Sequence, residues 1–371
     1  MTLDIITPER YVRGRGALHE AGDAAGAFLK DGNHARNILV IGGKTALAKT
    51  WGALGASLDR AGVRYEVREY AGYPNHGAAR AFAREAREKG CGAIAGVGGG
   101  RILDTAKSAA AEAGLPVIAA PTIAATCAGF AAVTIMYTEE GVFTEAVFRK
   151  NAPALAVVDT DVIAAAPAAY LRAGVADSLA KWYEAAPAAL RGGGLYARLA
   201  LKYGELIRDV LERYGPEVAD GVEKGAVNEA AFNDVLDAVF LLTGLCGSIT
   251  TAQMPRGIAH PLYNALSHYP ALRKRLHGEK VAFGYIAQGV LGNEEEKDVL
   301  SRVLTLKRLN IPLTFEALGF GADGDLESQL AETAARVKSA EPDYGGLDRP
   351  YTAEDLVKAM KQADKYARSV A

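Results

Sequence analysis

The sequence predicts an α/β domain with a parallel sheet in residues 1–162, followed by an all-helical domain in residues 163–371. Three observations lead to this fold class. The chain is 371 residues long, which favours two domains over one. Short apolar runs alternate with amphipathic stretches over the first 160 residues, as is typical of a parallel sheet covered on both faces. Beyond about residue 161 the strand pattern stops, and long stretches of helical periodicity follow.

The expected strands are short apolar runs bounded by turn residues, and they fall at residues 37–42, 65–70, 92–98, 116–120 and 155–159. A clear helical pattern between them covers residues 77–90. Residues 113–138 carry no charge, but Pro116 and Pro121 would interrupt a membrane-spanning helix. We therefore expect a buried strand, a loop and another strand there. In the second domain, helical periodicity is clear in residues 195–215 and 228–245.

Composition narrows the class of protein. A formal net charge of −2 gives no general electrostatic reason to bind nucleic acid or anionic lipid. The three cysteines are odd in number and far apart, so they form neither a disulfide framework nor a CxxC metal site. The first 16 residues contain no apolar core that could serve as a signal peptide. We expect a cytoplasmic homo-oligomer that acts on a small molecule, with no nucleic-acid or membrane partner.

A glycine-rich loop follows the expected strand at 92–98 and leads into a helix from about Arg101. Its glycines let the backbone turn tightly and approach a ligand closely; they are Gly96, Gly98, Gly99 and Gly100. The helix then directs its free N–H groups and positive end at the loop, which suits a diphosphate. Asp104, Thr105 and Lys107 could reach ribose hydroxyls and phosphate, or could form a solvated helix face. A purely structural tight turn is the alternative for the loop itself.

A second candidate loop, residues 121–130, comes immediately after the expected strand at 116–120. Thr122 and Thr126 can offer hydroxyls to a cofactor, and the small side chains around them leave room for one. Taken alone, the segment fits core packing as well as a binding site.

Three of the six histidines fall in residues 260–277. His260 would lie on a helix, Pro270 beyond its end, and His277 at the start of the next segment, so a helix–turn–helix could bring the two imidazoles together. Asp177 lies among apolar neighbours in the helical stretch 172–185 and could supply a carboxylate. Three protein ligands with one open position are typical of a catalytic divalent site. Singly, each of these residues could be merely packed or exposed; the remaining histidines are expected at the surface, and they are His19, His34, His76 and His268.

Together, four segments resemble the glycerol dehydrogenase-like branch of the iron-containing alcohol dehydrogenases: GVGGGRILDTAK, PTIAATCAGF, GVADSLAKWYEA and AHPLYN…LHGEKVAFG. The resemblance is collinear over most of the chain. It implies an NAD(P)-binding α/β domain and a helical domain that holds one divalent metal ion, zinc rather than iron. It places the metal ligands, and through the metal the catalysis, on Asp177, His260 and His277. It places the diphosphate loop on Gly98, Gly99, Gly100, Arg101 and Ile102, and further cofactor contacts on Thr122, Ile123, Ala124, Ala125, Ala131, Val133 and Tyr137.

The sequence departs from the family pattern at two places. Cys127 stands where glycerol dehydrogenases usually have an aspartate that touches the polyol, and the TIAATCA version of the loop is similar to a subgroup of hydroxycarboxylate dehydrogenases. Arg256, four residues before His260, could pair with a substrate carboxylate or could be a surface arginine at a helix start. Gly43 replaces the acidic residue that often holds the adenosine ribose, and Lys44 follows it. A basic residue there accommodates a 2′-phosphate, so we expect NADP(H) to be accepted.

These features predict a metal-dependent, NAD(P)-linked oxidoreductase that interconverts a small secondary alcohol and its ketone. The divalent cation would lower the pKa of the alcohol, and the nicotinamide would take the hydride. The favoured substrates are 2-hydroxy and 2-oxo acids, with glycerol as the alternative. A glycerol-1-phosphate dehydrogenase or a non-catalytic dinucleotide-binding protein is a lesser alternative. The first should show a more basic phosphate pocket, and the second should lack part of the ligand trio.

Overall fold

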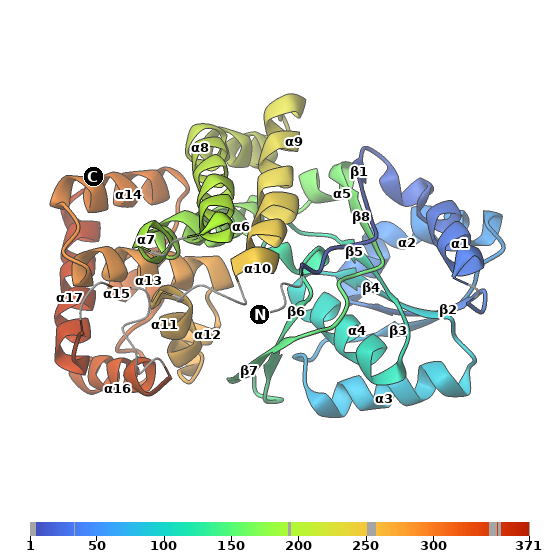
Figure 1. Ribbon diagram of the computed structural model, residues 1–371, viewed down its shortest axis with the longest axis horizontal. Coiled ribbons are helices and arrows are strands. Elements are labelled where there is room, and N and C mark those ends of the chain that lie inside the picture. The colour runs from blue at the N-terminus through green and yellow to red at the C-terminus, as the bar shows by residue number, and fades with distance from the viewer. Residues whose placement is uncertain are drawn as a thin grey trace. The chain divides into compact units, whose positions relative to one another are not determined.

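The computed structural model describes residues 5–32, 34–191, 194–250, 257–340, 347 and 350–370 (Figure 1). The chain divides into two compact units, Met1–Pro167 and Ala168–Ala371. The first unit is an α/β unit built on a parallel sheet, and the elements described in the second unit are all helices. The predicted fold class is confirmed.

The first unit is organised around a six-stranded parallel sheet with the strand order β1-β8-β5-β4-β2-β3. The strands are β1 (Arg10–Gly14), β2 (Asn37–Gly42), β3 (Arg64–Glu69), β4 (Ala93–Gly98), β5 (Val117–Pro121) and β8 (Leu155–Asp159). Five of these six lie within one residue of the predicted strands, and β1 was not predicted. An antiparallel pair, β6 (Val133–Tyr137) and β7 (Phe143–Phe148), stands apart from this sheet.

Helices cover both faces of the parallel sheet, as the apolar strands require. Helices α1 and α2 lie on one face of the sheet, and α3 and α4 on the other (Figure 1). Successive side chains of a strand point to opposite faces, so Ile38 and Val40 pack with α1 and α2, whereas Leu39 and Ile41 pack with α3 and α4. The helices of this unit are α1 (Ala21–Asp31), α2 (Lys44–Arg60), α3 (His76–Glu88), α4 (Gly100–Ala113) and α5 (Thr160–Ala164). Because β2, β4 and β5 are parallel neighbours, their carboxyl ends lie at one edge, where the candidate cofactor loops begin.

The second unit is a set of packed helices. They are α6 (Ala168–Tyr183), α7 (Ala186–Arg191), α8 (Leu195–Lys224), α9 (Glu229–Asp237), α10 (Thr243–Thr250), α11 (Ala259–Leu266), α12 (Pro270–Arg273), α13 (His277–Leu291), α14 (Glu296–Arg308), α15 (Phe315–Leu318), α16 (Leu326–Ala340) and α17 (Ala353–Ser369). A short π-helix, Ala238–Leu242, joins α9 to α10. Among the described residues, the run Glu229–Ser248 is long and apolar enough to cross a membrane. It buries Phe232, Val235, Leu236 and Phe240 inside the unit, as a core helix does.

The site of interest depends on how closely α6, α11 and α13 approach one another. Helix α13 packs against both α6 and α11. At Gly278, a Cβ atom would lie only 1.8 Å from the carbonyl oxygen of Ala173, so the α13 backbone at this residue touches the α6 backbone. At Gly284, a Cβ atom would lie 2.7 Å from the Cα of Ala259. Glycine at these two positions lets the backbones of three helices meet.

Candidate active site

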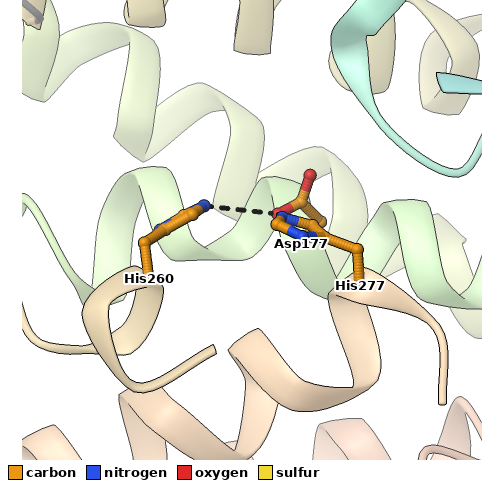
Figure 2. Close-up of side chains that lie close together, drawn as sticks. All are labelled: Asp177, His260 and His277. Atoms are coloured by element: carbon orange, nitrogen blue, oxygen red, sulfur yellow. Dashed lines mark ion pairs between the residues drawn. The ribbon is translucent and has the colours of Figure 1, made fainter. Parts of the chain in front are cut away.

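Asp177, His260 and His277 come together from three different helices of the second unit (Figure 2). The Oδ1 atom of Asp177 lies 3.0 Å from Nε2 of His277 and 3.6 Å from Nε2 of His260. One ligand atom from each residue lies within 4.8 Å of the others. A divalent ion with bonds of about 2.1 Å at tetrahedral angles holds its ligand atoms roughly 3.4 Å apart. The spacing therefore fits a single ion.

The surroundings of Asp177 also fit a cation. Its side chain is buried, and Oδ1 receives no well-aligned hydrogen bond from the described residues. Burial alone would raise the pKa of Asp177, but the charges of His277 and His260 and contacts with both rings hold it well below its ordinary value. A buried carboxylate with an unsatisfied oxygen is costly unless a positive group faces it. One carboxylate and two imidazoles, with no cysteine, suit zinc or ferrous iron.

A second carboxylate, Glu184, holds His260 from the other side of the ring. Its Oε2 lies 2.5 Å from Nδ1 of His260, and its Oε1 accepts a hydrogen bond of 3.1 Å from the backbone N–H of the same residue. Burial would raise the pKa of Glu184, but His260 lowers it below its ordinary value. Burial would lower the pKa of His260, but Glu184 and Asp177 raise it to about 9. Glu184 was not singled out from the sequence.

His277 is held by packing. The edge of its ring meets Tyr263, with 4.1 Å between the ring centroids. Tyr263 in turn lies beneath the ammonium group of Lys280, 5.0 Å from the ring centroid, and Lys280 donates a hydrogen bond of 3.0 Å to the carbonyl of Leu272. Burial lowers the pKa of Lys280 to about 8.

His268, expected at the surface, is exposed.

The predicted cofactor loops of the first unit lie against each other at the carboxyl edge of the sheet. The N–H of Thr122 donates a hydrogen bond of 3.1 Å to the carbonyl of Gly98. A Cβ atom at Gly99 would lie 2.6 Å from Cδ1 of Ile123, and one at Gly43 would lie 3.7 Å from Ile102. The structure thus brings Gly43, the loop 98–102 and the segment 122–125 together, with the start of α4 among them. That arrangement suits a dinucleotide diphosphate.

The predicted role of Asp104 in cofactor binding needs a correction, because the structure places its side chain in a buried network rather than at the loop. Its Oδ2 accepts a hydrogen bond of 3.1 Å from the N–H of Ile135, and its Oδ1 lies 2.8 Å from Nζ of Lys107. Lys107 donates to the carbonyls of Ala131 and Val133, at 3.1 and 2.7 Å. These two charged residues therefore tie β6 to α4. They face the interior of the unit, where they contact each other and the backbone of residues 131–135.

The other predicted residues are placed as follows. Arg101 is exposed, with its guanidinium 5.0 Å from the ring centroid of Tyr73, and that ring lies 5.6 Å from the ring of Tyr137. Lys44 is the exposed first residue of α2. Cys127 is half-buried at the start of a single 3₁₀ turn, Cys127–Gly129. Arg256 lies outside the described residues.

Comparisons with known proteins extend the geometry. A profile of the family described as iron-containing alcohol dehydrogenase matches residues 8–160. A glycerol dehydrogenase from Escherichia coli O6:H1 is 30% identical over 98% of this chain and 97% of its own length. Hydroxycarboxylate dehydrogenase A from Escherichia coli K12 is 29% identical over 90% of this chain and 91% of its own length. The crystal structure of a probable glycerol dehydrogenase from Sinorhizobium meliloti 1021 matches with a TM-score of 0.86 and 24% identity, and the match covers 100% of both chains.

The family match and the relatives define the class: the chain is a dehydrogenase, an NAD-dependent oxidoreductase acting on CH–OH groups. The chain belongs to the iron-containing alcohol dehydrogenase family and is glycerol dehydrogenase-like within it. Enzymes of this family use NAD and a divalent metal ion. On the substrate, the comparisons support glycerol, the alternative in the sequence analysis, better than the favoured 2-hydroxy acids.

Proposed function

We propose that the protein is a metal-dependent glycerol dehydrogenase, which interconverts glycerol or a closely similar polyol and the corresponding ketone. The observation that carries the proposal is the cluster of Asp177, His260 and His277. The match to a glycerol dehydrogenase over nearly the whole chain supports the choice of substrate. A small molecule as the reaction partner, and assembly of the chain into a homo-oligomer, are parts of the same proposal.

The chain's own residues prepare this site for a cation. When bound, a divalent ion supplies Lewis acidity that lowers the pKa of a substrate hydroxyl, a change worth on the order of 10 kcal/mol. Asp177 provides the buried negative charge, and Glu184 and Tyr263 hold the two imidazoles in place. We propose zinc as this ion, because two imidazoles and one carboxylate form a catalytic zinc ligand set and such sites bind zinc more tightly than ferrous iron.

For the cofactor, we propose that both NAD(H) and NADP(H) bind at the carboxyl edge of the parallel sheet. The start of α4 and the loop 98–102 would hold the diphosphate. Lys44, exposed next to the uncharged Gly43, would reach the 2′-phosphate of NADP(H). Lys44→Ala should then lower kcat/KM with NADPH more than with NADH. Equal losses with the two cofactors would remove Lys44 from this role.

A second candidate, reduction of 2-oxo acids, is favoured by one observation. Cys127 is uncharged, whereas an aspartate at this position would repel a substrate carboxylate by several kcal/mol in a poorly solvated site. The similarity to hydroxycarboxylate dehydrogenase A supports the same candidate. Arg256 would be the partner of that carboxylate.

The test is an activity panel of glycerol, other small diols and 2-oxo acids with each nicotinamide, using zinc-loaded and chelator-treated protein. Glycerol oxidation that disappears on chelation is the expected result. Preference for 2-oxo acids, shifted toward polyols by Cys127→Asp and weakened by Arg256→Ala, would establish the second candidate instead. Full activity in protein free of metal would refute the metal-dependent mechanism.

A further inference from the structure

We infer that Glu184 is a positioning residue of the metal site, which fixes both the tautomer and the orientation of His260 toward the ion. This inference rests on the proposed metal site. It concerns a residue that does not itself face the space between the three ligand atoms.

The tautomer follows from the hydrogen-bonding chemistry of the pair. An ionised carboxylate only accepts hydrogen bonds, so Nδ1 of His260, 2.5 Å from Oε2 of Glu184, must carry the proton. In the neutral imidazole this leaves the lone pair on Nε2. That atom is the one turned toward Asp177, 3.6 Å from its Oδ1 (Figure 2). Glu184 therefore holds the proton on Nδ1 and leaves Nε2 as the nitrogen that can bind a cation.

The orientation follows from a two-point contact. The two carboxylate oxygens of Glu184 hold the ring and the backbone N–H of the same residue, His260. Rotation of the ring about its side-chain bonds would break the first contact, and a shift of the helix start would break the second. Both oxygens thus contact His260, and neither belongs to the clustered ligand atoms of Asp177, His260 and His277.

The support behind Glu184 is built into the same helices. Glu184 follows Asp177 by seven residues, which is two helical turns, so the two side chains lie on the same face of α6 and its end. This face supplies one proposed metal ligand, Asp177, and the carboxylate that orients another, His260. Gln288 donates hydrogen bonds to the carbonyls of Tyr183 and Glu184, at 3.3 and 3.1 Å, and accepts one of 2.8 Å from the N–H of Ile258. The end of α6 and the start of α11 are thereby fixed to one side chain of α13.

Gly257 shows how closely these groups approach. A Cβ atom there would lie 2.3 Å from Cγ of Glu184 and 2.1 Å from Oε1 of Gln288. The segment that leads into α11 therefore passes directly against the side chain of Glu184, and only glycine fits at position 257. Contacts of this kind, in which a carboxylate fixes a ligating histidine, commonly change metal affinity by about 10- to 100-fold when they are removed.

Two substitutions weaken the pair of contacts in steps. Glu184→Gln keeps one acceptor and adds one donor, so it can satisfy either the ring or the backbone N–H of His260, but not both. Glu184→Ala removes both contacts. We expect the dissociation constant for zinc to rise about 10-fold in Glu184→Gln and about 100-fold in Glu184→Ala. The matched control is Glu212→Gln on α8, because Glu212 bonds the hydroxyl of Tyr183 and contacts no ligand of the proposed ion.

The experiment measures zinc and cobalt binding to the full-length protein by competition with a chromophoric chelator. Circular dichroism and thermal unfolding check the fold of each variant. In the cobalt-loaded protein, the visible absorption should change in the Glu184 variants and stay unchanged in the control. The double variant Glu184→Ala/His260→Ala should bind zinc no more weakly than His260→Ala alone, because Glu184 acts through the His260 ring. A structural role alone would add a separate loss.

The outcomes distinguish this inference from the proposed function. Wild-type protein that binds neither zinc nor cobalt would overturn both the metal site and the role of Glu184. Wild-type protein that binds zinc tightly, with Glu184→Gln equally tight, would overturn the role of Glu184 alone. Additive losses in the double variant would overturn it as well. If Glu184→Ala does not fold, the Glu184→Gln variant and its cobalt spectrum carry the test.

Discussion

Replacing Gly278 with alanine should push apart the two helices that carry Asp177 and His277. An added Cβ atom would lie 1.8 Å from the carbonyl oxygen of Ala173, 2.7 Å from its carbonyl carbon and 3.1 Å from the backbone nitrogen of Asp177. Carbon and oxygen atoms in contact ordinarily lie about 3.3–3.6 Å apart. The overlap is thus roughly 1.5 Å. It falls on backbone atoms, which cannot rotate away as a side chain does.

The consequence for metal binding follows from the narrow tolerance of coordination bonds. Metal–ligand distances usually vary by no more than about 0.2 Å. If α6 and α13 move apart by even a third of the overlap, the shift of the ligands exceeds this tolerance. The 3.0 Å between Asp177 and His277 would widen, and one of the three ligands would be lost. We expect zinc affinity to fall roughly 100-fold, about 2.8 kcal/mol. The same overpacking should lower the free energy of unfolding by about 1–3 kcal/mol.

The assay is zinc titration against a chelator, with thermal unfolding of the same samples. The control is Gly247→Ala on α10, where an added Cβ atom meets nothing within 4 Å. That control should bind zinc normally and should be no less stable than the wild type. A Gly278→Ala protein with the wild-type zinc dissociation constant would refute the reasoning, because the two helices would then have absorbed the overlap without moving the ligands.

Three further predictions concern other buried groups. Burial lowers the pKa of Lys280 from 10.5 to about 8, so the unfolded chain holds more protons between these pH values and stability rises with pH there. The rise in the free energy of unfolding should be on the order of 3 kcal/mol between about pH 7 and about pH 10, measured by urea unfolding, and Lys280→Met should abolish it. A rise that persists in Lys280→Met would contradict this assignment. Gly99→Ala should weaken NADH binding about tenfold by fluorescence titration, because its Cβ would lie 2.6 Å from Ile123. A second change, Ile123→Ala, should restore binding, and no recovery would rule out this clash. Asp104→Asn should lower the free energy of unfolding by about 3 kcal/mol and leave NADH binding unchanged. Weaker NADH binding at normal stability would return Asp104 to the cofactor site.

The central strands could be predicted because each is a nearly continuous apolar run between turn residues. β2 and β8 match the predicted strands over their full lengths. β1 was missed because its five residues, RYVRG, include two arginines and none of the five is buried, as suits an edge strand that pairs, in the described part of the chain, only with β8. β7, with the sequence FTEAVF, has no buried residue and pairs, among the described strands, only with β6. A strand with a single partner strand and no buried residue leaves little hydrophobic pattern in the sequence.

The metal ligands could be predicted because residue type and spacing narrow the choice. Glu184 could have been noticed from its seven-residue spacing from Asp177, but no local pattern indicates that it meets His260, which lies 76 positions away. The error at Asp104 and Lys107 has a similar cause. Charges three apart near a glycine loop are typical of a ligand-facing helix, and nothing in the sequence shows that β6 covers that side of α4.

The three-helix origin of the ligand cluster also affects the unfolded chain. Asp177 and His260 lie 83 positions apart in the sequence, and His260 and His277 lie 17 apart. An ion that joins all three acts as a reversible cross-link closing two loops. A covalent bond closing the longer loop alone would remove chain entropy worth about 4.5 kcal/mol from the unfolded state. Occupancy by the ion should therefore set how long the helical unit survives heat or a protease, and this unit should be the first to unfold in chelator.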